Sequence, residues 1–337
     1  MDAKGKLELI KRNLEEMVTE KELAKLLAEK KKITAYLGYA PTGKLHIGHF
    51  VPVLKMKDLI DCGIKFKFLT ADLHAHLDDL KSPWELLDAR SKYYEESIKL
   101  MLKAVGGDPK KVEFVRGSSF QYKEDYVKDV LRMAALVTLN RSKRAAAEVV
   151  RFGDEPKLGG FIYPLMQSED VIALGADIAL GGIDQRGPYM FARDILPEIG
   201  HKKPVCIFSP LVAGLTGDKM SASVEKSKVE ITDDEKTVEN KINSSFCESG
   251  NIKENALLEM VKFIIMPVGN KFIVERDKKY GGDLKYDDYK KLEKDFADKK
   301  IHPADLKKAV AKPINKLLVT IRKNFDMKII KKAYPND

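Results

Sequence analysis

The sequence has few cysteines and no long apolar run. Its three cysteines, Cys62, Cys206 and Cys247, are odd in number and far apart, which excludes a disulfide framework and a Cys-x-x-Cys zinc site. No stretch of about 18 apolar residues is present, and the N-terminus is charged and has no apolar signal-peptide centre. We therefore expect a cytoplasmic protein that does not bind a membrane.

Two common nucleotide-binding signatures are also missing. A P-loop requires Gly, four residues and then Gly-Lys-Ser/Thr; Gly43 and Gly48 have this spacing, but His49 and Phe50 follow the second glycine. The Gly-x-Gly-x-x-Gly run that binds dinucleotides after a strand does not occur in the chain. Neither of these two phosphate-binding loops is therefore expected.

Positive charge is concentrated at one end of the chain. The net charge is +9 over 337 residues, and residues 271–337 hold 19 Lys or Arg against 11 Asp or Glu. This region therefore carries +8 of the total. Such a surplus predicts a face for a polyanion such as RNA, and a solvated lysine-rich helical surface is the alternative.

Strand and helix patterns alternate through the first two thirds of the chain. The β-rich runs at 32–39, 64–70, 112–116 and 205–215 are separated by helical patterns, an order that predicts βαβ units. Beyond about residue 233 helical patterns dominate. We predict an α/β fold with a doubly wound parallel, Rossmann-like sheet and a C-terminal α-helical domain. The predicted boundaries are 1–30 for an N-terminal helical arm, 31–233 for the catalytic domain and 234–337 for the helical domain.

The stretch "HIGH", residues 46–49, lies where a strand pattern turns into a helix. A helix N-terminus presents unpaired backbone N–H groups to phosphates, and His46 and His49, three residues apart, share one face. Gly48 between them lets a flat ring approach the backbone without meeting a Cβ. A second polar loop, "GDKMSAS" at 217–223, follows near the end of the α/β region.

"HIGH" together with "KMSAS" at 219–223 resembles the class I aminoacyl-tRNA synthetases, and the short chain is similar to the subclass of tyrosyl and tryptophanyl enzymes. The resemblance implies that a carboxylate attacks the α-phosphate of ATP, that pyrophosphate leaves, and that the acyl group passes to tRNA. Positioning and cationic or N–H donors stabilise such a transition state. The donors implied are His46, His49 and Lys219, and Gly48, Asp184, Met220, Ser221 and Ser223 would contact ATP.

The same resemblance implies that Mg²⁺ arrives with ATP and that the protein needs no metal site of its own. The group "HAH" at 74–76, with Asp78 and Asp79, carries metal-ligand side chains, but we do not interpret it as a metal cluster. Ala222 stands where the commonest family motif has a second lysine. Lys219 is therefore expected to carry the charge of that loop alone.

"YPLMQSED", residues 163–170, is the strongest indication of the amino acid. Tyr163, Gln167 and Asp170 fall at i, i+4 and i+7 on one helical face, an unusual arrangement for a core stripe. The chain resembles archaeal and eukaryotic tyrosyl-tRNA synthetases, in which the matching positions bind tyrosine. The resemblance implies that Tyr36 and Asp170 bind the phenolic hydroxyl, that Tyr163, Gln167 and Gln185 bind the α-amino group, and that Ala71 and His74 line the pocket.

Contacts with tRNA(Tyr) are also implied by the resemblance. Asp305 would bind the first anticodon base, with His302 and Tyr280 beside it, because RNA loops are usually read by stacking and by base edges. Arg144 and Arg186 would contact the acceptor stem. Gly187 departs from the family, which usually has a lysine there, and leaves the detail of this recognition open. A homodimer is implied by the family alone.

Three other functions fit parts of the pattern. Tryptophanyl enzymes of archaea and eukaryotes commonly carry "KMSAS", but an indole offers one donor, and Tyr36 with Asp170 favours a phenol. A nucleotidylyltransferase also uses His-x-Gly-His, yet it needs neither the residues at 163–170 nor a basic helical domain. A non-catalytic paralogue that only binds RNA would need the basic region alone.

Overall fold

The computed structural model describes residues 1–30, 32–78, 80–150, 152–217 and 227–335. A six-stranded sheet lies at its centre, in the order β1-β6-β5-β2-β3-β4. Strands β2 to β6 run parallel, as the α/β prediction requires, and the direction of winding reverses between β2 and β5. These strands are β2 (Thr34–Tyr39), β3 (Lys65–Thr70), β4 (Val112–Arg116), β5 (Ile178–Gly182) and β6 (Val205–Ser209).

The N-terminal arm contains a strand as well as the two predicted helices. Between α1 (Ala3–Lys11) and α2 (Glu20–Glu29), β1 (Glu16–Val18) joins the sheet antiparallel to β6. The sheet is therefore mixed at this edge. A strand of three residues is too short to show an alternating pattern in the sequence. Without β1, the outer backbone groups of β6 would be left unpaired at the edge of the sheet.

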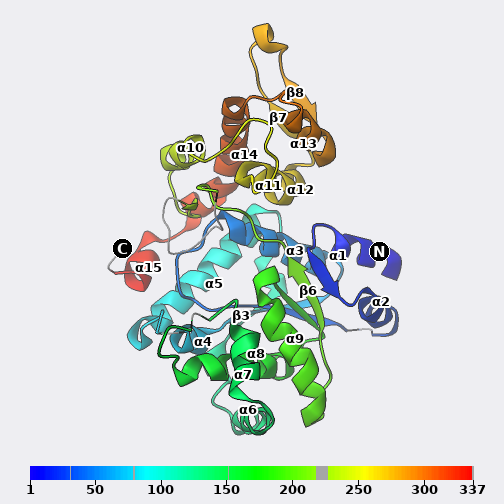
Figure 1. Ribbon diagram of the computed structural model, residues 1–337, viewed down its shortest axis with the longest axis vertical. Helices are drawn as coiled ribbons and strands as arrows, with labels where there is room; N and C mark the ends of the chain where they lie inside the picture. Colours follow the sequence, from blue (N-terminus) through cyan, green and yellow to red (C-terminus); the bar gives the residue numbers. More distant parts are fainter. Residues whose placement is uncertain (31, 79, 151, 218–226, 336–337) are drawn as a thin grey trace.

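Helices cover both faces of the sheet (Figure 1). Ala35 and Leu37 of β2 join the buried cluster that includes α3 and α5, whereas Tyr36 joins the one that includes α8 and α9. Successive side chains of a strand point to opposite faces, so Tyr36 faces the helix that carries residues 163–170. The helices of this part are α3 (Phe50–Asp61), α4 (Asp72–Leu77), α5 (Leu87–Ala104), α6 (Glu124–Leu136), α7 (Leu139–Ala146), α8 (Leu158–Ala173) and α9 (Arg186–Ile195).

The C-terminal part is helical with one added hairpin. Strands β7 (Phe272–Val274) and β8 (Leu284–Tyr286) pair antiparallel, and the loop between them projects from the end of the molecule (Figure 1). Helices α14 and α15 return to pack on α5, where the Arg90 Nε donates to the carbonyl of Ala333 (3.1 Å). The helices are α10 (Glu235–Asn243), α11 (Ala256–Met260), α12 (Met266–Gly269), α13 (Tyr289–Ala297), α14 (Pro303–Asn324) and α15 (Met327–Ala333). None of the helices in the described residues is long and apolar enough to cross a membrane.

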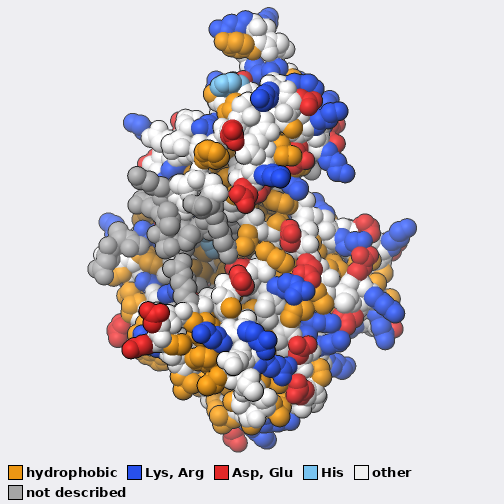
Figure 2. All heavy atoms as spheres, viewed as in Figure 1, with side chains coloured by type: hydrophobic (Ala, Val, Ile, Leu, Met, Phe, Trp, Pro, Cys, Tyr) orange, Lys and Arg blue, Asp and Glu red, His pale blue; other side chains and the backbone are white. Residues whose placement is uncertain are grey.

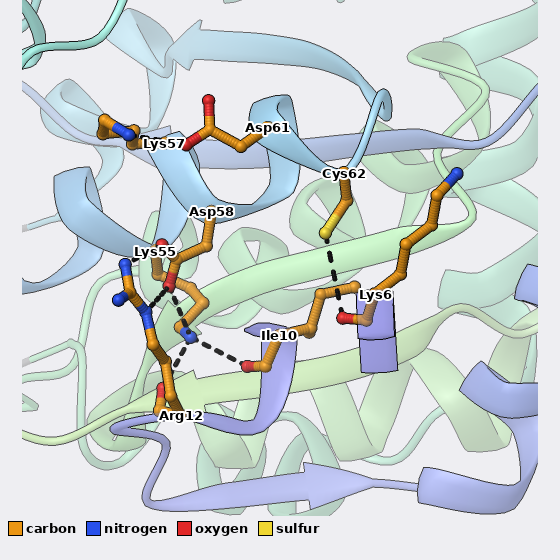
Figure 3. A network of polar contacts seen from close by, with 8 residues as sticks. All are labelled: Lys6, Ile10, Arg12, Lys55, Lys57, Asp58, Asp61 and Cys62. Atoms are coloured by element: carbon orange, nitrogen blue, oxygen red, sulfur yellow. Dashed lines mark hydrogen bonds and ion pairs between the residues drawn. The ribbon is translucent and has the colours of Figure 1, made fainter. Parts of the chain in front are cut away.

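Buried charges join the N-terminal arm to α3 (Figure 3). The side chains of Lys55 and Asp58 are each 3% exposed, and Lys55 Nζ lies 3.1 Å from Asp58 Oδ2. The same ammonium donates to the backbone carbonyls of Ile10 (2.8 Å) and Arg12 (2.6 Å), and the Arg12 guanidinium pairs with Asp58. The network therefore fixes α3, the helix that directly follows "HIGH".

Replacing Asp58 with alanine is expected to lower the free energy of unfolding by about 3–5 kcal/mol, because the buried Lys55 ammonium loses its counter-charge. Asp61→Ala is the matched control, since Asp61 pairs with Lys57 on the surface of the same helix (Figure 3) and is 43% exposed. Asp61→Ala should lower the free energy of unfolding by less than about 1 kcal/mol. Urea denaturation of both variants measures the difference, and equal losses would contradict a specific role for the buried network.

Candidate active site

A cleft of about 320 Å³ opens at the carboxyl ends of β2 and β5. Parallel sheets bind ligands at this edge, where the winding reverses, because loops from both halves diverge there. The chain segments after the two strands supply most of the predicted residues. Those that line the cleft are His46, Gly48, His49, Tyr163, Asp184 and Gln185.

The two histidines of "HIGH" lie against each other at the mouth of α3. His46 caps a short 3₁₀ turn, Ile47–His49, and the centroids of the two rings are 4.2 Å apart. The Nδ1 atom of His49 lies 3.2 Å from the backbone nitrogen of His46, which anchors the second ring. Burial lowers the pKa of His49 to about 4, and burial with the neighbouring His49 lowers the pKa of His46 well below its usual range. Both rings are therefore neutral at pH 7 and offer N–H donors.

Asp170 lies in the protein interior, among the residues predicted to bind tyrosine. Its side chain is 1% exposed, and its Oδ1 atom accepts hydrogen bonds from Gln121 Nε2 (2.7 Å) and from the Tyr126 hydroxyl (2.9 Å). The Nε2 atom of His74 lies 3.7 Å from Oδ2. Burial raises the pKa of Asp170 to about 7, although the two hydrogen bonds act against the rise. Among the described residues, no full positive charge is recorded beside this carboxyl group.

Four polar atoms around Asp170 are buried without a hydrogen-bond partner in the described part of the chain. They are the Tyr36 hydroxyl, His74 Nε2, Gln121 Oε1 and Gln167 Oε1. An unpaired buried polar group costs about 1–3 kcal/mol, so four in one place indicate a site built for a polar ligand. Burial raises the pKa of Tyr36 far above neutrality, so its hydroxyl keeps a proton to donate.

The remaining predicted tyrosine-binding residues meet around this group. Gln167 Nε2 donates to Gln185 Oε1 (3.1 Å), and the Tyr163 ring lies 4.6 Å from the His74 ring. Ala71 is buried at the start of α4, the helix that carries His74. The structure therefore brings the seven residues together from β2, α4, α8 and the turn after β5.

Four residues near the site were not predicted from the sequence. Gln121 and Tyr126 hold Asp170 from 49 and 44 residues away, and Tyr189 packs edge-on against Tyr36 with ring centroids 6.1 Å apart. Lys228 is buried beside the paired histidines and forms an ion pair with Glu230 (3.2 Å). No motif marks these positions, because each contact depends on how the elements pack. Lys219, Met220, Ser221 and Ser223 lie outside the described residues.

The residues predicted to bind the anticodon lie at the far end of the molecule. Tyr280 is 65% exposed on the projecting β7–β8 loop, and His302 and Asp305 lie at the start of α14. His302 caps that helix by accepting from the backbone N–H of Ala304 (3.2 Å). No hydrogen bond or ring contact joins Tyr280 to either residue within the described ranges. The three therefore lie on two elements of one basic end, Tyr280 on the β7–β8 loop and the other two at the start of α14.

The residues predicted to contact the acceptor stem lie on α7 and α9. Arg144 is exposed, while Arg186 forms two hydrogen bonds with Glu16 of β1 (2.6 and 3.0 Å). A Cβ atom on Gly187 would lie 2.6 Å from the carbonyl oxygen of Ala145. Helix α7 therefore packs so closely that no side chain fits at position 187. A lysine at this position would therefore require α7 to shift.

A family model described as "tRNA synthetases class I (W and Y)" matches residues 28–319, so the chain belongs to this class of enzymes. Within the class its relatives include the tyrosine--tRNA ligase of Haloarcula marismortui, 50% identical over 99% of this chain and 98% of that protein. The tyrosine--tRNA ligase of Archaeoglobus fulgidus is 43% identical over 98% of this chain and 100% of its own. The chain therefore groups with the archaeal and eukaryotic tyrosine--tRNA ligases.

Solved structures agree with this grouping. The tyrosyl-tRNA synthetase of Archaeoglobus fulgidus, solved with L-tyrosine, has a TM-score of 0.90 at 43% identity and covers 96% of this chain and 99% of its own. A tryptophanyl-tRNA synthetase from Plasmodium falciparum has a TM-score of 0.71 at 17% identity over 98% of this chain and 90% of its own, which shows a common fold alone. The tryptophanyl and nucleotidylyltransferase alternatives are not favoured.

Proposed function

We propose that this chain activates L-tyrosine with ATP to tyrosyl-adenylate and transfers the tyrosyl group to tRNA(Tyr). One observation carries the proposal: the unpartnered Tyr36 hydroxyl and the Asp170 carboxyl group lie buried behind a cleft lined by paired histidines. A phenol suits this pair, because its hydroxyl can donate to the carboxylate and accept from the Tyr36 hydroxyl. Tyrosine--tRNA ligases with about half of the residues identical support it.

In this proposal Tyr36 and Asp170 hold the phenolic hydroxyl of tyrosine, and the ring lies along Ala71 and His74. Gln167, Gln185 and Tyr163 hold the α-amino group at the opening toward the cleft, where Tyr163 and Gln185 line its wall. Substrate binding would then give the buried Gln167 Oε1 a donor. The carboxylate of tyrosine is left pointing toward the cleft, where the reaction with ATP takes place.

The cleft is the proposed site of adenylation. ATP, bound as its Mg²⁺ complex, places its phosphates at His46 and His49, its adenine over Gly48 and its ribose near Asp184. The tyrosine carboxylate attacks the α-phosphate and pyrophosphate leaves, so the donors needed are those that stabilise negative charge on the phosphate oxygens. The neutral imidazoles supply N–H groups for this, and Lys228 adds a nearby cation that sequence reasoning missed. Lys219, Met220, Ser221 and Ser223 are proposed to complete the site.

An exchange assay tests the proposed activity. The purified chain with ATP and labelled pyrophosphate should form labelled ATP when tyrosine is added, and archaeal tRNA(Tyr) should then be charged. Phenylalanine and tryptophan at the same concentration are the matched controls. Exchange driven by tryptophan would overturn the assignment of the amino acid, and tRNA binding without any exchange would indicate a non-catalytic RNA-binding protein.

The C-terminal part is the proposed anticodon-binding region. Figure 2 shows Lys and Arg side chains around the end of the molecule where β7, β8 and α13 lie. Asp305 is proposed to bind the first anticodon base beside His302 and Tyr280, and Arg144 and Arg186 to contact the acceptor stem. Arg186 would first have to exchange Glu16 for a phosphate or base.

A homodimer and a cytoplasmic location complete the proposal. Large apolar side chains are exposed along α6 and at the start of α7, at the lower end of the molecule in Figure 1. Monomers rarely leave such side chains grouped in water, so this face suits the partner copy. The side chains concerned are Val127 (43% exposed), Leu131 (63%), Leu136 (48%) and Leu139 (65%).

Tyrosine should bind about 10-fold more tightly at pH 8 than at pH 6, because the pKa of Asp170 in the free protein is raised to about 7 and only the ionised carboxylate accepts the phenolic proton fully. The pKa values of His49 and His74, about 4, lie outside this window, whereas the pKa of the neighbouring Glu169, which burial raises to about 8, lies at its edge. Equilibrium dialysis with labelled tyrosine measures the change. Asp170→Asn should remove the pH dependence and Glu169→Gln should keep it, whereas a flat profile in the unmodified protein contradicts the assignment.

A further inference from the structure

A group of metal-ligand side chains lies outside the site described above. Among the residues that the structure describes, Asp129, Glu169 and His201 offer ligand atoms that all lie within 4.8 Å of one another. They come from α6, α8 and the segment after the 3₁₀ turn Leu196–Ile199. The sequence predicts no metal site here, because Asp129 and His201 are 72 residues apart and no ligand spacing joins them.

Glu169 is the residue that indicates a missing ligand. It is 4% exposed, and its Oε2 atom is buried without a hydrogen-bond partner in the described part of the chain. Burial, followed by the charges of Asp129 and Asp170, raises the pKa of Glu169 to about 8, although the charge of Arg132 acts against the rise. A carboxyl group is rarely buried beside two others unless a cation or a full set of donors is there to stabilise it.

The other two ligands are already oriented. His201 Nε2 lies 2.6 Å from Asp129 Oδ2, while Arg132 donates to Asp129 Oδ1 (2.8 Å) and to the carbonyl of Ile199 (2.9 Å). Arg132 therefore holds the carboxylate so that one oxygen stays turned toward the histidine, as outer partners do at metal sites. Partial burial would raise the pKa of Asp129, but the hydrogen bonds from His201 and Arg132 outweigh it and lower the pKa.

We propose that Asp129, Glu169 and His201 bind one divalent cation of the zinc type. One imidazole nitrogen and two carboxylate oxygens suit Zn²⁺ or Co²⁺ better than Mg²⁺ or Ca²⁺, which prefer oxygen ligands alone. Ligands of a tetrahedral zinc ion lie about 3.3 Å apart, so the cation draws Glu169 inward and separates His201 from Asp129. His201 is 30% exposed, which gives the cation a path from solvent.

The cation would join three segments that support the tyrosine pocket. Helix α6 carries Tyr126 and helix α8 carries Asp170, and these two side chains are hydrogen-bonded to each other at 2.9 Å. Glu169 directly precedes Asp170 in the chain. A cation bound between α6 and α8 therefore stabilises the wall that holds the phenol-binding carboxylate, without touching the substrate.

Calorimetric titration of the chelator-treated, full-length chain with Zn²⁺ in the absence of ATP tests this. One equivalent should bind, the melting temperature should rise by about 3–6 °C at 100 times the dissociation constant, and Co²⁺ should show the absorption of a low-coordinate N/O site. Glu169→Gln and His201→Asn should each lower the Zn²⁺ affinity at least about 30-fold, as loss of a ligand or its outer partner does.

Asp125→Asn is the matched control, because Asp125 is exposed one turn before Asp129 on the same helix and should leave Zn²⁺ binding unchanged. Glu169→Gln removes a buried carboxyl group and is expected to fold, so its failure to bind is informative. Absence of stoichiometric Zn²⁺ binding up to 1 mM in the unmodified chain would overturn the proposal. Equal Zn²⁺ affinity in Glu169→Gln and the unmodified chain would also overturn it, by placing the ion elsewhere.

Discussion

Asp170→Ala is expected to reduce the preference for tyrosine over phenylalanine by about 10²-fold. A hydrogen bond to a charged group contributes about 1.5–3 kcal/mol, and removing the carboxylate removes that gain for tyrosine while phenylalanine loses nothing comparable. Rejection of phenylalanine by about 10⁵ without editing is known for a tyrosyl enzyme. The ratio of kcat/KM for the two amino acids in pyrophosphate exchange measures the effect.

Two further variants separate recognition from folding. Asp170→Asn keeps an oxygen that accepts from Gln121 and Tyr126, so it preserves the packing while removing the charge. The Asp170→Asn variant should lose most of the preference for tyrosine over phenylalanine. Asp194→Ala, at an exposed position on α9, should leave the ratio unchanged. If the phenylalanine ratio of Asp170→Asn equals that of the unmodified chain, Asp170 does not read the phenol.

His46→Ala is expected to lower kcat for adenylate formation by about 10²–10³-fold while the dissociation constant of tyrosine stays the same. Loss of one donor that is aimed at developing negative charge has this magnitude in other enzymes. The His46 Nδ1 atom is buried without a partner among the described residues, so the ring has donor or acceptor capacity left for a ligand. Tyrosine binding depends on other side chains, so kcat should fall while the dissociation constant of tyrosine stays unchanged.

The matched control is His76→Ala, because His76 packs on Trp84 and its Nδ1 lies 3.1 Å from the carbonyl of Ser82. This variant loses an imidazole that lies in the same domain but outside the proposed ATP site. Single-turnover formation of tyrosyl-adenylate gives the rate, and fluorescence titration gives tyrosine binding. A rate for His46→Ala within about 3-fold of the unmodified chain would rule out the proposed role.

The site divides into residues that a motif reveals and residues that only packing reveals. Tyr163, Gln167 and Asp170 lie on one helix, and a helical period of 3.6 makes their common face visible in the sequence. Gln121 and Tyr126 follow no period relative to Asp170 and reach it from a separate loop and helix. The three-residue strand β1 was missed for a related reason, since its partner lies almost 200 residues away in β6.

The sequence by itself determined the α/β class, the basic C-terminal end and the "HIGH" motif, because periodicity, charge and short motifs are local properties of the chain. The residues expected at the tyrosine and ATP sites came from the resemblance to a family. Only the tertiary structure decided which charges are buried. The pKa of Asp170 near 7, the neutral state of His49 and the meeting of Asp129 with Glu169 and His201 all depend on which helices exclude water from which side chains. Desolvation is a property of the packed interior, and no stretch of sequence carries it.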